Sequence, residues 1–439
     1  SEEADPPAAD ALSFGATATA ERGTTPVMPA ATSDIDLDPA PYRAVPRRSA
    51  ESLLTLGPGL FLVNHSGLFH ASSLLLRGFD AGEGRDLEVL VAGVPINDPS
   101  NPHGHGYADT HFVIPELVHG VRVTEGPFAP WQSDFAVAGS ADYELGASTR
   151  GILARGELGS FDTHRLLLAW APVGAREGTF VGVDLRETAG FGPNRRALSL
   201  ALNAGFEERL SPEWAFRLFG AMHFADFASA GIVRLDDVRA GRLPCSADYG
   251  SQFLCAADPD QGGASARLLL SATLRWARPG ASFESVIFGG WRRLRIRENF
   301  TGFLLDDRGD GLDEQYEVGT VGARGAYRFE VDALDQPQAF EIGYVARHDS
   351  GVSRVLRHRA EDGIPYQADL DDEIHITHLG AHLGADLRFT DFLSLRAGLR
   401  LDGFAFSTRA RAEPSSDRVG ERLPELASDA FGIALQPRG

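Results

Sequence analysis

One segment gathers side chains that can bind a metal or a small ligand. The stretch from Asn97 to His111 is rich in Gly, Pro and Asn and contains three histidines. Imidazole suits Zn, Cu, Fe and Ni, although the spacing matches no standard zinc site. The alternative is a loop whose histidines form hydrogen bonds with backbone or water. The candidate ligand-facing residues are Asn97, His103, His105, Tyr107, Asp109 and His111.

A second candidate is an acidic run with partial EF-hand spacing. Asp306, Asp310 and Glu317 occupy the first, fifth and twelfth positions of such a loop. Arg308 stands at the third position, where an oxygen ligand is required. A cation there repels a metal, so we interpret the run as an acidic turn and expect neither a resident metal nor another cofactor.

The remaining reactive residues give no catalytic motif. Cys245 and Cys255 fall in one predicted long loop. They can form a disulfide in an oxidising compartment, and exposed free thiols are usually avoided; two unpaired thiols are the alternative. The sequence contains no Gly-x-Ser-x-Gly elbow, no His-Glu-x-x-His pair and no Lys for a phosphate-binding loop. We therefore expect no enzyme activity.

Composition restricts the class of protein further. The chain has 439 residues and a net charge of −20, which disfavours nucleic acid as a partner. It has no apolar run of about 18 residues, so a transmembrane helix is excluded. A membrane role would require a closed β-barrel, because only helices and barrels satisfy their backbone groups in lipid.

From Gly151 onward, a two-residue alternation of apolar and polar side chains predicts long strands. Short connections at 210–212, 277–281, 333–338 and 389–392 alternate with long ones at 227–263, 298–314, 349–372 and 408–428. Outer-membrane barrels have this asymmetry. A soluble sandwich would also alternate, but with shorter strands. Eleven strands are expected, centred near residues 155, 167, 182, 202, 218, 270, 289, 323, 344, 382 and 399.

The C-terminal end of the sequence bears on completeness. Phe431–Leu435 begins a twelfth strand, and the sequence ends shortly after it. An open sheet with a bare edge cannot sit in lipid. We therefore expect the sequence to be a fragment whose further strands are missing.

Residues 46–148 resemble the plug domain of TonB-dependent outer-membrane transporters. Five short motifs occur in the order and spacing of that family and precede the barrel-like region. They are Ser49–Leu54 leading to Gly57-Pro58-Gly59, Leu75-Leu76-Arg77-Gly78-Phe79, Val89–Asn97, Ile114-Pro115-Glu116 and Val121–Pro127.

The resemblance implies a mainly β fold in three parts. Residues 1–45 are a flexible periplasmic tail, 46–148 a small α+β plug, and 149–439 a transmembrane antiparallel β-barrel. The barrel is partial, with about 11–12 strands of an expected 22. The family also implies a location in the bacterial outer membrane, with a plug apex loop facing the ligand, here the histidine-containing segment.

The resemblance also implies how the plug is held and moved. Arg77 is expected to latch the plug onto barrel carboxylates, but the second arginine of such a latch is replaced by Glu125. The usual motifs after that point are replaced by Trp131–Ser140. The TonB contact would fall within Leu12–Ala20; a disordered Ala/Thr tail is the alternative there. Its contact residues would be Phe14, Ala16, Thr17, Ala18 and Thr19.

We therefore expect an outer-membrane receptor that imports an unknown small ligand. Its partners would be outer-membrane lipid and TonB with its inner-membrane energising complex. Two alternatives remain: a TonB-independent outer-membrane channel or surface-binding protein, and a secreted soluble β-protein.

Overall fold

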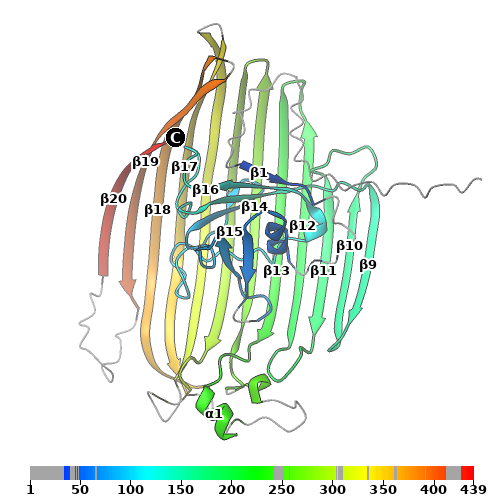
Figure 1. Ribbon diagram of the computed structural model, residues 1–439, viewed down its shortest axis with the longest axis vertical. Helices are drawn as coiled ribbons and strands as arrows, with labels where there is room; N and C mark the ends of the chain where they lie inside the picture. The colour runs from blue at the N-terminus through cyan, green and yellow to red at the C-terminus, as the bar shows by residue number, and fades with distance from the viewer. Residues whose placement is uncertain are drawn as a thin grey trace, which may run out of the picture.

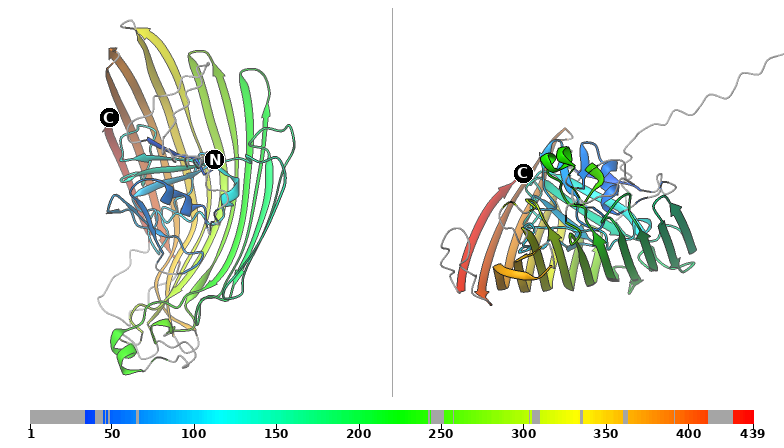
Figure 2. Two further views of the ribbon diagram at one scale, coloured as in Figure 1. Left: turned by 45° about the vertical axis from the view of Figure 1, so that its right-hand side comes forward. Right: turned by 90° about the horizontal axis from the view of Figure 1, so that it is seen from below.

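The computed structural model consists of a large curved sheet with a small domain on its concave side (Figures 1 and 2). It describes residues 34–39, 45, 47, 49–64, 67–241, 243, 252–256, 258–302, 304, 310–333, 336–359, 363–390, 392–411 and 427–439. Among these residues, no helix is both long enough and apolar enough to cross a membrane.

The large sheet contains twelve antiparallel strands in sequence order, from β9 at one edge to β20 at the other. It is open, and β9 and β20 are its edge strands. The strands are β9 Gly151–Gly159, β10 Thr163–Ala171, β11 Phe180–Thr188, β12 Ala197–Arg209, β13 Trp214–Ala228, β14 Gly262–Arg278, β15 Ala281–Glu298, β16 Gly311–Ala333, β17 Gln336–His358, β18 Pro365–Thr390, β19 Leu393–Ala410 and β20 Ala427–Arg438.

The predicted strands are confirmed. Each of the eleven predicted centres falls within a strand, and β20 contains the predicted beginning of a twelfth. One end of the sheet has the short connections 210–213, 279–280, 334–335 and 391–392, whereas the other end has the long ones 229–261, 299–310 and 411–426. The longest of these contains the short helix α1 (Leu235–Ala240) and the 3-10 helix η5 (Gln252–Leu254).

The predicted long loop at 349–372 is wrong. β17 continues to His358 and β18 begins at Pro365, so most of this polar segment lies in the sheet. Cross-strand ion pairs stabilise the extension: Arg354 to Asp371 at 2.9 Å and Arg357 to Asp369 at 2.8 Å. The polar composition of this segment led to the prediction of a loop. Strands with many charged residues can, however, extend a sheet beyond its apolar band.

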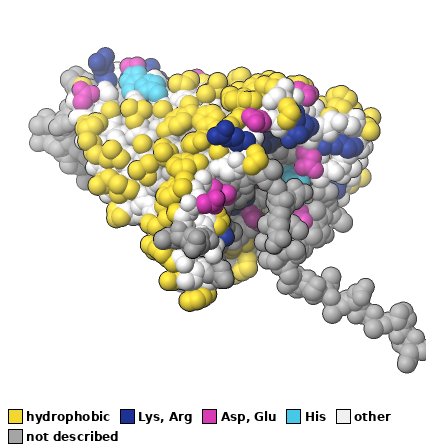
Figure 3. All heavy atoms as spheres, turned by 90° about the horizontal axis from the view of Figure 1, so that it is seen from above, with side chains coloured by type: hydrophobic (Ala, Val, Ile, Leu, Met, Phe, Trp, Pro, Cys, Tyr) yellow, Lys and Arg dark blue, Asp and Glu magenta, His cyan; other side chains and the backbone are white. Residues whose placement is uncertain are grey.

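The outer face of the sheet is apolar and the inner face is mixed. In β10, for example, Leu166, Leu168 and Trp170 are exposed outside while Arg165 and Leu167 are buried inside. Figure 3 looks onto the end with the short turns and shows hydrophobic side chains over much of the visible surface of the sheet. Such a face can meet hydrocarbon.

Aromatic side chains form a row near the short-turn end of the sheet. The centroids of Trp214 and Trp276 lie 6.3 Å apart. From Trp276 the row continues through Tyr327 and Phe329 to Phe340, and the successive rings stack with centroids 6.4, 5.6 and 5.4 Å apart. Membrane barrels carry such aromatic girdles at the level of the lipid headgroups.

The small domain, which we call the plug, contains two sheets. The five-stranded sheet has the order β1-β7-β8-β5-β6 and the three-stranded sheet the order β2-β3-β4. Its described helices are 3-10 helices, and the first of them falls on the Ser49–Leu54 motif. The elements are β1 Asp34–Leu37, η2 Glu51–Leu56, β2 Leu60–Val63, β3 Ser73–Leu76, β4 Phe79–Asp80, β5 Leu87–Val91, β6 Val94–Pro95, η3 Pro115–Leu117, β7 Val118–Glu125 and β8 Gly139–Leu145.

The predicted boundary between tail and plug needs correction. β1 lies within the segment predicted as tail, yet it pairs antiparallel with β7, with Ile35 opposite Val123 and Leu37 opposite Val121. The alternation of Ile35 and Leu37 with acidic residues is the signal that the Ala- and Pro-rich composition concealed. The strand Asp34–Leu37 therefore belongs to the five-stranded sheet of the plug.

We expect an arginine on the outer face to destabilise the sheet in a bilayer. Leu270 lies in the middle of β14 and is 57% exposed. Leu270→Arg should cost about 2–4 kcal/mol, because a guanidinium at the centre of the bilayer must be solvated or dragged to the surface. Denaturant unfolding in lipid vesicles measures this cost. Leu304→Arg, in an outer connection, is the matched control, and an equal cost for both variants would contradict a lipid-facing surface.

Candidate functional site

The plug is anchored to the first strands of the sheet by Glu116, which belongs to η3. Both carboxylate oxygens of Glu116 accept hydrogen bonds at 2.7 Å from the guanidinium of Arg165, and Arg155 donates to it at 2.8 Å. Arg165 also pairs with Asp184 at 2.9 Å, and its side chain is 4% exposed. Because an unpaired buried charge is costly, this bidentate pair specifies where the plug sits.

A second anchor lies further round the sheet. Asp109 of the plug is fully buried and pairs with Arg292 of β15 at 3.0 Å. Asp98 lies 3.5 Å from Arg292 and 3.6 Å from Arg267 of β14. The guanidinium of Arg347 in β17 donates to the carbonyl of Asn97 at 2.9 Å. Three lumen-facing arginines, from β14, β15 and β17, thus hold one plug loop.

Polar contacts also hold the segment at residues 130–134, where the sequence departs from the family pattern. Arg324 of β16 donates to the Trp131 carbonyl at 3.3 Å, and Arg400 of β19 donates to the Ser133 hydroxyl at 3.1 Å. Nearer the first strands, Asn203 of β12 accepts from the Ile114 amide and donates to the Phe112 carbonyl, at 2.9 and 2.8 Å. These contacts distribute the anchoring over most of the sheet.

The predicted latch between Arg77 and barrel carboxylates stays a prediction, and the ion pairs between plug and sheet in the described structure run the other way. We expected plug arginines to meet barrel carboxylates, but in the described structure barrel arginines meet plug acids and carbonyls. Arg77 lies instead in a two-residue turn between β3 and β4, with φ of 49°, and its side chain is 67% exposed. It pairs at 2.7 Å with Glu125, the residue that replaces the second arginine. A hairpin turn projects Arg77 away from the interface.

The ligand-facing segment is mostly structural. Asn97 is buried, donates to three backbone carbonyls and accepts from the Val89 amide. Tyr107 is buried and its hydroxyl accepts from the Ala71 amide. Asp109 and His111 pair with each other at 2.7 Å inside the plug. These four residues use polar atoms in holding the loop, and a ligand-facing role for them stays a prediction.

The two remaining histidines of the segment stay near the surface. His105 is exposed and contacts the carbonyl of Pro99 at 3.0 Å. His103 lies 2.7 Å from Glu314 of β16 and 3.3 Å from Glu83 of the plug. Burial disfavours its charged form, but the hydrogen bonds that the imidazolium donates to the Glu314 and Glu83 carboxylates outweigh that effect and raise the pKa of His103 to about 10.

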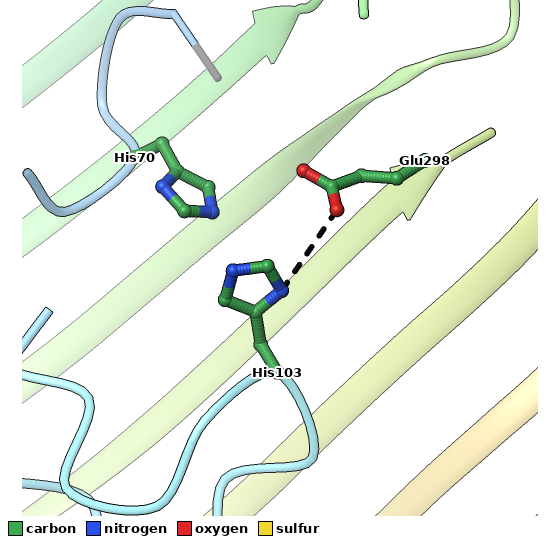
Figure 4. Close-up of side chains that lie close together, drawn as sticks. All are labelled: His70, His103 and Glu298. Atoms are coloured by element: carbon green, nitrogen blue, oxygen red, sulfur yellow. Dashed lines mark ion pairs between the residues drawn. The ribbon is translucent and has the colours of Figure 1, made fainter. Parts of the chain in front are cut away.

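His70 lies beside His103, with ring centroids 4.7 Å apart, and it was not singled out from the sequence. Burial lowers the pKa of His70 despite the nearby Glu83 carboxylate, so its ring is neutral at pH 7. One donor atom each from His70, His103 and Glu298 lie within 4.8 Å of one another (Figure 4). Of the predicted segment, His103 is therefore the residue that the fold places in a cluster suited to a metal.

The other predicted site residues either lie outside the described residues or are not part of the histidine cluster. Phe14, Ala16, Thr17, Ala18 and Thr19 of the TonB contact, Cys245 and Asp306 lie outside the described residues. Cys255 is buried and disulfide-bonded. Asp310 is buried beside Thr301, whereas Glu317 lies within β16, 3.9 Å from Arg293. That these acids form no EF-hand site stays a prediction, because Asp306 lies outside the described residues.

A cavity of about 770 Å³ lies between the plug and the sheet. Its lining includes residues 175–178 of a connection at the short-turn end, and it is rich in charge. Asp142 of β8 is partly buried at its wall, between Glu144 and Arg324. Burial, together with the Glu144 carboxylate, raises the pKa of Asp142 to about 6 even though Arg324 opposes the shift. The cavity gives the interface an interior that polar solutes can occupy.

Comparisons with known proteins find relatives by structure alone. No protein-family model and no curated protein matches the sequence. The ferric citrate transporter FecA aligns with a TM-score of 0.71 at 12% identity, over 92% of this chain and 59% of that one. The copper transporter OprC gives 0.66 at 15% identity, over 93% and 61%. The ferric yersiniabactin uptake receptor FyuA from Yersinia pestis gives 0.65 at 14% identity, over 92% and 61%.

These likenesses establish the fold. It is the plug-and-barrel fold of the TonB-dependent outer-membrane receptors, as the sequence motifs predicted. The chain spans about 60% of the length of the structures that it matches. That further strands close the barrel stays a prediction.

Breaking the Glu116 anchor should loosen the plug. Glu116→Gln leaves Arg165 buried with one partner fewer, so we expect the plug to lose about 3–5 kcal/mol. Protease sensitivity of residues 49–145, measured with increasing denaturant, reports the loss. Glu317→Gln is the matched control, since Glu317 is 54% exposed and such pairs contribute about 0–1 kcal/mol. Equal protection in both variants would show that the anchor does not hold the plug.

The stability of the plug should fall as pH rises through about 6. The folded state binds the Asp142 proton more tightly than the unfolded chain does, so ionisation above this pH is unfavourable and the effect vanishes below about pH 4. Asp142→Asn should be more stable than wild type at pH 8, and a shift of this size corresponds to about 3 kcal/mol at most. The gain should be smaller than this limit because the side chain is partly exposed to solvent. The measurement is denaturant unfolding at pH 4 and pH 8.

The result at pH 4 supplies the internal control, because the Asp142→Asn and wild-type proteins should then be equally stable. Asp36→Asn, on the exposed edge strand β1, should change stability by less than about 1 kcal/mol at either pH. A gain for Asp142→Asn of the same size at both values would exclude titration of Asp142 as the cause.

Proposed function

We propose that this chain forms the plug and part of the barrel of an outer-membrane receptor, which binds a ligand at the cell surface and imports it with energy from TonB. The observation that carries the proposal is the seating of the plug. A folded domain occupies the concave side of a sheet whose outer face is apolar, and buried ion pairs join the two.

The nature of the contacts supports a plug that moves. A buried ion pair replaced by apolar groups is often no less stable, since desolvation of the charges offsets much of their attraction. Such pairs therefore specify position while adding little net stability. The charged cavity beside Asp142 separates part of the plug from the sheet, so that rearrangement need not begin from a close-packed interface.

The apolar outer face and the row of stacked aromatic rings favour a membrane protein over the secreted soluble β-protein. A soluble protein rarely exposes such a large contiguous apolar surface. The proposed work is binding and transport without covalent chemistry. Transport that does not need TonB remains the competing function. Whether the N-terminal tail binds TonB distinguishes the two functions.

Binding to TonB tests the coupling. The purified periplasmic domain of TonB should bind the full chain, and Ala18→Pro should weaken binding at least tenfold, because a proline removes a backbone donor needed for pairing with an extended partner strand. Ala8→Pro, outside the predicted contact, is the matched control. Surface plasmon resonance measures both variants.

Deletion of residues 1–30 extends this test and leaves β1 in place, whereas removal of the whole predicted tail would delete a strand of the plug. The deletion should abolish binding to TonB while the plug stays protected from protease. A wild-type chain that binds no TonB domain would favour the TonB-independent channel.

A further inference from the structure

The ends of β15 and β16 and two plug loops bring five potential metal ligands together. Glu298 is the last residue of β15, and Glu314 lies near the start of β16, at the end of the sheet that has the long connections. His70, Glu83 and His103 come from the plug. His103 lies 2.7 Å from Glu314, 3.3 Å from Glu83 and 4.0 Å from Glu298.

His70 supplies an independent sign of a ligand. It is 1% exposed, and its Nε2 is buried without a hydrogen-bond partner among the described residues. Its Nδ1 lies 3.0 Å from the carbonyl of Ala71, which can only accept, so Nδ1 carries the proton and Nε2 of the neutral ring has a lone pair. In Figure 4, Nε2 points into the space between His103 and Glu298. A ring held through Nδ1–H to a backbone carbonyl is the usual arrangement of a metal-binding histidine.

The surroundings hold both imidazoles in place. The ring of Tyr107 meets those of His70 and His103 edge-on, at centroid distances of 5.6 and 5.9 Å. Its hydroxyl is already occupied by the Ala71 amide at 2.8 Å. Side chains restrained in this way lose little entropy when they bind an ion.

We propose that His70, His103 and Glu298 bind a single divalent first-row transition-metal ion, with Glu83 and Glu314 as further carboxylate ligands. The ion would then be the cargo that the receptor imports, and this part of the inference rests on the proposed function. Two imidazoles disfavour Ca²⁺ and Mg²⁺, which take oxygen ligands, and the absence of sulfur among these five side chains disfavours Cu(I). Zn²⁺ suits a mixed nitrogen and oxygen set.

The spacing fits one ion and leaves no room for its chelator. The three donor atoms lie within 4.8 Å of one another, and donors around a tetrahedral zinc lie about 3.4 Å apart, so a closure of about 1 Å completes the site. The protein groups would then occupy most of the coordination positions. The site therefore takes the ion without a bulky organic carrier.

The origin of the ligands suggests how the ion is released. His70, Glu83 and His103 move with the plug, whereas Glu298 and Glu314 stay with the strands. Any displacement of the plug away from β15 and β16 divides the ligand set between two bodies. Each half keeps two or three donors, which is too few for a closed tetrahedral site.

Titration of the metal-stripped full chain with Zn²⁺ tests the site. One Zn²⁺ should bind per chain, as measured by calorimetry in detergent, and Co²⁺ in its place should give visible absorption bands. His103→Gln and Glu298→Gln should each weaken the binding at least tenfold. His375→Gln, on β18 and 42% exposed, is the matched control and should bind as wild type does.

Circular dichroism and protease protection of the plug show whether each variant is folded, and Glu298→Gln keeps the shape of the side chain. No saturable Zn²⁺ binding by the wild type, or equal binding by all three variants, would overturn the inference. Failure of the proposed function gives a different result: Zn²⁺ binding would persist, but the chain would neither bind TonB nor take up radiolabelled Zn²⁺ into cells.

Discussion

A buried charge must have a partner of opposite sign, and this requirement joins the plug to the sheet. Arginines at lumen-facing positions of separate strands reach carboxylates or carbonyls of the plug, and two of the buried ones, Arg165 and Arg292, meet Glu116 and Asp109. Loss of either member leaves a buried charge with fewer partners, whereas the intact pair adds little net stability. The interface is therefore specific in position and still separable, which is what a movable plug needs.

The same requirement defines the register of the sheet. In β10, Arg165 faces the plug while its neighbours Leu166 and Leu168 face outward. Because side chains alternate with a period of two, a slip by one residue would expose the arginine on the apolar face and bury leucines among the plug acids. Membrane solvation on one side and charge pairing on the other thus select a single arrangement.

The histidine cluster lies on this interface, where the plug meets the strand ends of β15 and β16. It differs from the inner anchors in being assembled around imidazoles, one of them with an unpartnered nitrogen among the described residues. The inner anchors pair guanidinium groups, which cannot bind a metal, with carboxylates, whereas the Nε2 of His70 gives this cluster a metal-binding atom that is unused among the described residues. Position and unused capacity together distinguish a binding site from a structural contact.

The sequence by itself determined the strands, the asymmetry of their connections and the plug motifs, because alternation and turn residues are local properties of the chain. It did not reveal that 349–372 extends the sheet or that β1 joins the plug, since polar composition concealed both. Only the tertiary structure decided which polar groups pair with one another inside the protein. Asp109 pairs with both His111 and Arg292. By contrast, His70 and His103, which are far apart in the chain, lie beside Glu298. Such pairings depend on contacts across the plug and the sheet, and no sequence period encodes them.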